Sequence, residues 1–234
     1  MRIPNLPRLA NTQLSRSDVN YLHYLSLHRD VKNAIATYAT GKVLDIGCGN
    51  KPYENEFRER ADQYLGCDIE QSSLSKVDIV CDATNIPLPS GEFDTVFSTQ
   101  AIEHIAEHQQ VLNEAYRLLK PGGIMIISGP FYWPPHEEPH DYFRFTKYGF
   151  EYILNKAGFT IEKIIENGGS WATTGQSLIH SMMNSTSRHF LMRLLRFLFF
   201  RLKMYRIHNS IFAWLDRIDF NTGMTMNYVI VAKK

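Results

Sequence analysis

The segment Val43-Leu-Asp-Ile-Gly-Cys-Gly49 constrains the fold of this chain more than any other part of the sequence. An apolar run that ends in two glycines is typical of a buried β-strand entering a tight turn. Pro52 follows the turn, and proline is well tolerated in the first turn of a helix. Backbone N–H groups in such a turn can approach a ligand closely. The segment therefore predicts a strand, turn and helix unit that either binds a ligand or serves only as a tight structural turn.

Strand and helix patterns alternate along the chain. Apolar runs bounded by turn residues predict strands over residues 42–46, 63–67, 77–81, 93–98, 123–128, 159–166 and 226–233. Apolar residues at helical spacing predict helices over residues 17–38, 52–61, 109–119 and 147–157. This alternation favours a parallel sheet with helices on both of its faces.

About sixty residues separate the last two predicted strands, whereas connections in compact domains have a median of roughly 4 to 6 residues. We therefore expect an inserted helical subdomain. Within it, residues 187–207 predict one basic amphipathic helix, with Phe and Leu roughly opposite a basic sector. That sector contains Arg188, Arg193, Arg196, Lys203 and Arg206. Such a helix either lies on an anionic membrane or packs against the rest of the chain or a second copy.

The bulk composition limits the remaining possibilities. A chain of 234 residues with 44% hydrophobic and 21% charged residues can bury one sizeable core. Cys48, Cys67 and Cys81 are too scattered for a disulfide framework or a zinc-ligand spacing. The amino terminus lacks a secretory pattern and no apolar stretch reaches 18 residues. We expect a cytoplasmic protein, and one basic run on a chain of net charge +1 does not indicate a nucleic-acid partner.

Five further phrases follow the glycine turn in an order that resembles the class I S-adenosylmethionine-dependent methyltransferases. They are Tyr64-Leu-Gly-Cys-Asp-Ile-Glu70, Cys81-Asp-Ala-Thr-Asn-Ile-Pro-Leu-Pro89, Glu92-Phe-Asp-Thr-Val-Phe-Ser98, Ala101-Ile-Glu-His-Ile105 and Leu118-Leu-Lys-Pro-Gly-Gly-Ile124. A nicotinamide-binding fingerprint would need a third glycine where Pro52 stands, which argues against a dinucleotide. The phrases look most similar to the type 11 group, which includes quinone and small-molecule methyltransferases.

The resemblance implies an α/β fold with a Rossmann-like, doubly wound sheet of seven strands. The sheet is mostly parallel with an antiparallel last strand, and a helical insertion precedes that strand. The expected segments are an N-terminal helical segment 1–41, a core 42–167 that binds S-adenosyl-L-methionine, the basic insertion 168–222 and the final strand 223–234. The cofactor is expected across the carboxyl ends of the first strands, as the crevice rule for open α/β sheets also predicts.

The resemblance also implies the cofactor-binding residues. Asp68 ends the second strand and would accept both ribose hydroxyls, although a solvated strand-end acid is the alternative. Asp82, with the Ala83 N–H group, would read the adenine edge, unless it only caps a turn. The other expected members are Asp45, which orients the turn amides, Gly47, Cys48 and Gly49 beside the methionine part, Ile69 after the ribose acid, and Thr99 and Gln100 nearest the sulfonium. We interpret Cys48 as a small packing residue and not a nucleophile.

The loop Trp133–Thr146 follows the fifth predicted strand, so it is expected above the methyl donor. His136 and His140 would share a helix face, but Pro134, Pro135 and Pro139 oppose a helix there. With no cysteine or third histidine nearby in the sequence, we expect no metal site.

Methyl transfer to a hydroxyl needs alignment, exclusion of water and a proton acceptor. We expect His140 to be the general base, because a neutral imidazole can accept a proton near pH 7. Asp141 or Glu138 would hold its ring, and Tyr142 and Arg144 would shape or grip the acceptor. In the alternative structural interpretation, Arg144 pairs with a loop carboxylate and the aromatic residues only cover the sheet.

These observations together predict a methyltransferase that methylates an oxygen of a small or lipid-linked, glycan-type acceptor. The basic insertion suggests work at the inner membrane surface as a peripheral protein, or self-association through residues 187–207. Carbon methylation of a quinone is the alternative within the class. A non-catalytic regulator or scaffold that binds S-adenosylmethionine is the alternative outside it.

Overall fold

The computed structural model describes residues 8–234, which divide into two compact units. The first combines residues up to Thr12 with 30–165 and 227–234, and the second combines 13–29 with 166–226. The predicted N-terminal segment 1–41 is therefore shared between the two units, and its residues 1–7 lie outside the described part of the chain.

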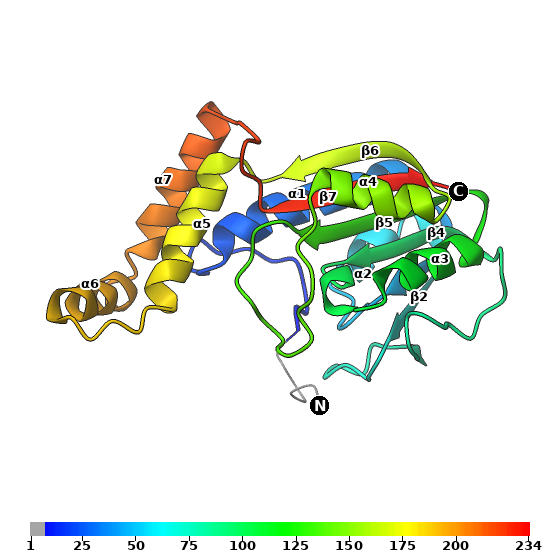
Figure 1. The fold of residues 1–234 in the computed structure, drawn as a ribbon, viewed down its shortest axis with the longest axis horizontal. Coiled ribbons are helices and arrows are strands. Elements are labelled where there is room, and N and C mark those ends of the chain that lie inside the picture. The colour runs from blue at the N-terminus through cyan, green and yellow to red at the C-terminus, as the bar shows by residue number, and fades with distance from the viewer. Residues whose placement is uncertain (1–7) are drawn as a thin grey trace. The chain divides into compact units, whose positions relative to one another are not determined.

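A seven-stranded sheet forms the centre of the first unit (Figure 1). Its strands are β1 (Gly41–Ile46), β2 (Ala61–Asp68), β3 (Ile79–Val80), β4 (Phe93–Thr99), β5 (Leu119–Pro130), β6 (Thr160–Asn167) and β7 (Asn227–Lys233), in the order β3-β2-β1-β4-β5-β7-β6. Strands β1, β2, β3, β4 and β5 pair in parallel, whereas β7 is antiparallel to β5. The predicted doubly wound sheet with an antiparallel last strand is thus confirmed.

The central strands are buried on both faces, which explains their nearly continuous apolar sequences. One face packs against α3 (His108–Leu118) and α4 (Lys147–Lys156), whose buried residues join those of the sheet in a single core. Residues 30–38 of α1 (Tyr21–Tyr38) lie behind the sheet in the view of Figure 1. Phe57 of α2 (Glu54–Phe57) contacts the ring of Phe97 from β4.

Two predicted elements of the first unit are shorter than expected. The helix predicted over 52–61 is the single turn α2, because β2 already begins at Ala61 and Phe57 alone supplies its buried contact. The strand predicted over 77–81 is the two-residue edge strand β3. Asp78, directly before β3, accepts hydrogen bonds from the Gly66 N–H group and from Lys51, so side-chain contacts replace part of the ladder.

The second unit contains the helices of the insertion, α5 (Ser170–Met183), α6 (Phe190–Arg201) and α7 (Tyr205–Ile218). A Cβ added at Gly175 would lie 2.5 Å from Phe212, so the absence of a side chain there lets α5 and α7 approach closely. The buried Asn209 amide of α7 donates to the carbonyl groups of Arg16 and Asp18. These bonds attach the N-terminal stretch to the insertion helices.

The single amphipathic helix predicted over residues 187–207 is wrong. The chain leaves helical geometry at Leu202–Met204, where Lys203 has φ of +51°, and α6 and α7 are separate helices. Lys203 and Arg206 therefore do not share a helical face with the arginines of α6. None of the residues of α6 is buried. Among residues 8–234, no helix is both long and apolar enough to cross a membrane.

Candidate active site

The glycine turn lies between the carboxyl ends of β1 and β4, where the direction of strand succession reverses. Gly47 has φ of +74° and Gly49 has φ of +50°, a left-handed geometry that glycine adopts without steric cost. A Cβ at Gly47 would lie 2.6 Å from the Cβ of Ala101, in the loop after β4. Open α/β sheets bind ligands at this reversal point. The turn therefore lies where a cofactor would approach, and a side chain at position 47 would collide with Ala101.

Asp45 is held differently from the expected geometry. The turn amides of Gly47 and Cys48 donate to the Cys67 carbonyl, at 2.9 and 3.1 Å, and not to Asp45. The Asp45 carboxyl is 2% exposed and accepts a hydrogen bond from the Tyr64 hydroxyl. Burial raises its pKa to about 7, against the smaller lowering effects of this hydrogen bond and of the Lys51 charge. Asp45 thus joins β1 to β2 as a buried and partly neutral acid.

Asp68 is the acid at the end of β2, as expected, and it is not solvated. It is 8% exposed, and its Oδ2 accepts from the Gly49 N–H group at 3.0 Å. Its Oδ1 accepts from the N–H group of Ile69 at 2.8 Å. The structure also places Arg8 there, because its Nη1 lies 2.7 Å from Oδ2. No sequence pattern pointed to this arginine, which is 60 residues away from Asp68 along the chain.

The candidate adenine residues lie on an exposed turn next to β3. Asp82 accepts from both the N–H group and the hydroxyl of Thr84, and these bonds lower its pKa. This geometry is that of the turn cap considered as the alternative for Asp82. The preceding Cys81 N–H group donates to the Asp68 carbonyl at 2.9 Å, so the turn begins beside the ribose acid. Ala83 is half-buried against the core.

Thr99 and Gln100 lie at the carboxyl end of β4. Gln100 has φ of +50°, and its side-chain amide donates to the Ser128 hydroxyl of β5 at 3.2 Å. On the other side of the turn, burial raises the pKa of the Cys48 thiol, so the group stays protonated and is a poor nucleophile. The structure therefore brings the residues expected near the sulfonium to one edge of the sheet.

Arg144 braces the loop between β5 and α4. A guanidinium group has five N–H donors, and all five are used here. Two bond the Asp141 carboxylate at 2.7 and 2.8 Å, and the others bond the carbonyl groups of Trp133, Pro134 and Phe143. The Asp141 side chain is 5% exposed, and its pKa falls to about 2 against the raising effect of burial. The expectation that Arg144 grips an acceptor is corrected, because no donor remains for one.

His140 is half-buried in the same loop, and its ring is held by Tyr142. Its Nδ1 lies 3.0 Å from the Tyr142 hydroxyl. The prediction that Asp141 or Glu138 holds this ring is corrected for Asp141, since that carboxylate is occupied by Arg144 and by the His136 N–H group at 2.9 Å. For Glu138, no bond to His140 is present among the described residues, and its side chain is exposed.

A second cluster, which the sequence did not reveal, joins the loop to the end of β4. It consists of Glu103, His104 and His136, whose potential ligand atoms lie within 4.8 Å of one another. Glu103 and His104 are in a 3-10 helix (Ile102–His104) that follows β4. Burial raises the pKa of Glu103 to about 8, and burial also lowers the pKa of His104. The sequence does show a Glu-His pair, Glu103-His104, after the end of a strand. The third member of the cluster, His136, lies 32 residues after His104 and could not be linked to the pair.

The sequence of this chain is similar to those of known methyltransferases. A family model described as a methyltransferase domain matches residues 44–127. The chain is 26% identical over 138 residues to the ubiquinone biosynthesis O-methyltransferase of Psychrobacter cryohalolentis, covering 53% of this chain and 51% of that protein. It is 33% identical over 147 residues to the chloroplastic 2-methyl-6-phytyl-1,4-hydroquinone methyltransferase 1 of Oryza sativa subsp. japonica, covering 56% and 44%. The chain thus spans about half the length of these relatives.

The fold extends beyond the matched residues. The crystal structure of an S-adenosylmethionine-dependent methyltransferase from Mesorhizobium loti superposes with a TM-score of 0.55 at 14% identity, over 93% of this chain and 98% of that one. The family and the fold imply S-adenosyl-L-methionine as the cofactor, and the turn at 47–49 beside Asp68 fits it. Residues 44–127 therefore carry a methyltransferase domain of the type 11 group, within a fold shared with solved class I S-adenosylmethionine-dependent methyltransferases.

Proposed function

We propose that this chain transfers the methyl group of S-adenosylmethionine to a hydroxyl oxygen of a small or lipid-linked, glycan-type acceptor. The observation that carries the proposal is the contact between the glycine turn and the strand-end acid, in which the Gly49 N–H group donates to Asp68. This contact puts backbone donors and a carboxylate at the reversal point of the sheet. A nucleoside with a charged amino-acid tail needs groups of both kinds.

The cofactor supplies the electrophilic methyl group, so the protein has to bind, orient and accept a proton. Asp68 binds the ribose hydroxyls, and the turn at 47–49 approaches the methionine part. His140 accepts the hydroxyl proton through Nε2. This role requires the tautomer in which Nδ1–H donates to the Tyr142 oxygen, because only then does Nε2 carry a free lone pair. The bond from the His104 ring to the His140 carbonyl, at 2.8 Å, joins this part of the loop to the segment after β4 and supports the assignment.

Carbon methylation of a quinone-type ring is the second candidate. It is favoured by the 33% identity to a hydroquinone methyltransferase from rice. An electron-rich ring carbon is itself a nucleophile and needs less help from a base. The two candidates therefore differ in how strongly turnover depends on His140. A scaffold that only binds the cofactor would show no turnover with either class of acceptor.

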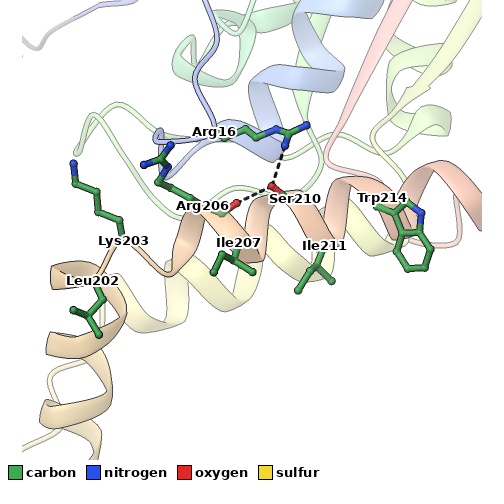
Figure 2. Close-up of a pocket in the computed structure, with 8 residues that line it drawn as sticks. All are labelled: Arg16, Leu202, Lys203, Arg206, Ile207, Ser210, Ile211 and Trp214. Atoms are coloured by element: carbon green, nitrogen blue, oxygen red, sulfur yellow. Dashed lines mark hydrogen bonds between the residues drawn. The ribbon is translucent and has the colours of Figure 1, made fainter.

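The second unit carries basic and apolar residues side by side, which suits a binding partner that is both anionic and apolar. A pocket of about 670 Å³ is lined by Arg16, Lys203 and Arg206 together with the apolar residues Leu202, Ile207, Ile211 and Trp214. Figure 2 shows Ile207, Ile211 and Trp214 projecting from one side of α7, while Arg16 reaches Ser210 on another. Residues 167–215 contain six basic and no acidic residues. We propose that this face binds an anionic membrane surface, since the lipid would complement both its charge and its apolar side chains.

The cofactor site is tested by titrating the protein with S-adenosylhomocysteine in a calorimeter. We expect Asp68→Ala to weaken binding about 100-fold, because two hydrogen bonds to a charged acceptor are lost. Asp62→Ala is the matched control, since it removes an exposed acid near the start of the same strand. Equal affinities of Asp68→Ala and the wild type would contradict the ribose assignment.

Turnover is tested with labelled methyl donor and membrane extract, followed by identification of the labelled acceptor. With a hydroxyl acceptor, His140→Ala should lower kcat by about 100-fold or more, in the range typical of general-base catalysis. Tyr142→Phe should have a smaller effect, because it loosens the ring without removing it. A full rate for His140→Ala on a hydroxyl acceptor would exclude this base, and labelling of a ring carbon would support the second candidate.

Membrane binding is tested by flotation with vesicles of phosphatidylcholine, with and without phosphatidylglycerol. Lys203→Glu and Arg206→Glu together should abolish flotation with the anionic vesicles. Lys163→Glu, an exposed lysine on β6, is the control for net charge. Flotation of the double variant at the wild-type level would contradict the membrane proposal, and a concentration-dependent dimer in its place would assign the face to a second copy.

A further inference from the structure

Glu103 is a fully buried carboxyl group with unmet hydrogen-bonding capacity. Its exposure is 0%, and neither of its side-chain oxygens has a hydrogen-bond partner among residues 8–234. Its backbone carbonyl, by contrast, accepts from the Tyr142 N–H group at 2.9 Å, which ties the 3-10 helix to the loop. A buried carboxyl without partners is costly, so natural proteins rarely leave one unsatisfied by a ligand, an ion or a water molecule.

His104 presents a free ring nitrogen to this carboxyl. Its Nδ1 lies 2.8 Å from the His140 carbonyl, which can only accept, so Nδ1 carries the proton. The lone pair is then on Nε2, which is 3.9 Å from Glu103 Oε1. Histidines that bind metals commonly donate their other N–H group to a backbone carbonyl in this way, since the bond fixes the tautomer and the ring orientation.

His136 completes the cluster from the loop after β5. Its ring packs edge-on against that of His104, with centroids 4.6 Å apart, and its Nδ1 has no hydrogen-bond partner among the described residues. The nearest carboxylate oxygen to Nδ1 is Asp141 Oδ2 at 3.4 Å. Asp141 also accepts from the His136 backbone N–H group and is held by Arg144. The loop braced by Arg144 thus holds the His136 imidazole beside Glu103 and His104 of the 3-10 helix.

We propose that Glu103, His104 and His136 bind one divalent transition-metal ion, and that this ion is Zn²⁺. Two neutral imidazoles and one carboxylate form a ligand set that zinc uses in catalytic sites, with a fourth position left for an oxygen ligand. Ligand atoms about 2 Å from a common ion lie at most roughly 4 Å apart. The present limit of 4.8 Å therefore requires small side-chain rotations on binding.

The fourth position gives the ion a role that rests on the proposed function, whereas metal binding itself does not. A hydroxyl acceptor is an oxygen ligand, and binding to zinc would lower the pKa of its hydroxyl group. His140 lies in the same loop as His136, and its carbonyl contacts His104. Its ring would accept the proton of the acceptor hydroxyl. The oxygen would then form the bond to the methyl carbon as the bond from carbon to sulfur breaks.

The experiment uses the full chain without a histidine tag, stripped with chelator and titrated with Zn²⁺ in a calorimeter and with Co²⁺ in a spectrometer. We expect one ion per chain and Co²⁺ absorption bands of the intensity typical of four or five ligands. Glu103→Gln and His136→Ala should each weaken Zn²⁺ binding by about 100-fold or more. His189→Ala, which changes an exposed histidine of the second unit, should bind as the wild type does.

Two results of the titration would overturn the proposal. Failure of the stripped wild type to bind an ion, or undiminished binding in both ligand variants, overturns it. If Glu103→Gln does not fold, as judged by loss of S-adenosylhomocysteine binding, His136→Ala and the Co²⁺ spectrum of the wild type still decide. Full methyl transfer in the presence of chelator would leave the proposed function intact and exclude a catalytic role for the metal. A bound ion without methyl transfer to any acceptor would support the metal site and contradict the proposed function.

Discussion

The two halves of the candidate site satisfy their buried acids in different ways. In the cofactor half, Asp45 accepts from Tyr64, and Asp68 accepts from two backbone N–H groups and from Arg8. In the acceptor half, Asp141 accepts from Arg144 and from the His136 N–H group, and Glu103 has no hydrogen-bond partner among the described residues. The first half is built mainly from strand ends and turn amides, whereas the second depends on one loop that folds back on the segment after β4. The acids of the cofactor half are therefore satisfied by the protein itself, whereas Glu103 of the acceptor half is not, which is consistent with the ion proposed above.

The strongest predicted change in stability concerns Asp45, whose buried carboxyl group lies in the cofactor half. The pKa of Asp45 is about 7 in the folded chain, against the ordinary value of 3.8. The folded state therefore binds the proton more tightly, and the stability contributed by the neutral carboxyl is complete below about pH 4 and lost as the pH rises through 7. A difference of about three pKa units corresponds to roughly 4 kcal/mol.

The measurement is urea unfolding of the wild type and Asp45→Asn at several pH values. Between pH 4 and 7, the free energy of unfolding of the wild type should fall relative to that of the variant by up to about 4 kcal/mol. The subtraction cancels the contributions of other titrating groups, including Glu103. If the two plots of unfolding free energy against pH were parallel, Asp45 would be ionised in the folded chain. Its negative charge would then be stabilised by Tyr64 and Lys51.

The next effect concerns the bracing of the acceptor half. Arg144→Met leaves the buried Asp141 carboxylate without its two-point partner, and we expect a loss of about 3 kcal/mol in the free energy of unfolding. Adding Asp141→Asn should restore part of this loss, because the amide oxygen can still accept from His136 and carries no charge. Arg58→Met, at an exposed arginine of the first unit, should change stability by less than about 0.5 kcal/mol. Equal stability of Arg144→Met and Arg58→Met would show that the loop does not need this ion pair.

The fold was predictable because its signals are local. The strands β1, β4, β5 and β7 are buried on both faces, so each reads as a nearly continuous apolar run. The turn at Gly47 and Gly49 was also predictable from local sequence, because its positive φ angles favour glycine. The break between α6 and α7 was not predictable, because Leu202–Met204 contains neither glycine nor proline and its apolar spacing continues across the turn.

The candidate site was predictable only where it depends on the backbone. Asp68 could be assigned because it ends a strand, and its position follows from the topology. The cluster of Glu103, His104 and His136 could not, because residues 32 positions apart meet only when the loop after β5 folds back on the end of β4. The role of Arg144 was misread for a similar reason. Its donors are consumed by carbonyl groups of its own loop, and sequence patterns do not show which carbonyl groups a loop turns inward.

The weakest predicted change concerns Arg8 and tests whether its side chain blocks the ribose site at Asp68. Arg8 bonds Asp68 at 2.7 Å and Glu70 at 3.2 Å, and its carbonyl accepts from the Asn50 amide. Its guanidinium therefore occupies the oxygen that a ribose hydroxyl would use. Since partly exposed ion pairs contribute up to about 1 kcal/mol, we expect Arg8→Ala to strengthen S-adenosylhomocysteine binding by up to about fivefold.

Two controls make the result for Arg8 specific. Glu70→Gln removes only the weaker partner of Arg8, so it should strengthen binding less than Arg8→Ala does. Arg16→Ala removes an arginine of the second unit that bonds Ser210, and the Kd should not change. A weaker Kd for Arg8→Ala would reverse the interpretation, because the arginine would then bind the cofactor instead of competing with it. The cofactor half would in that case resemble the acceptor half, with a site completed by a residue from a distant segment of the chain.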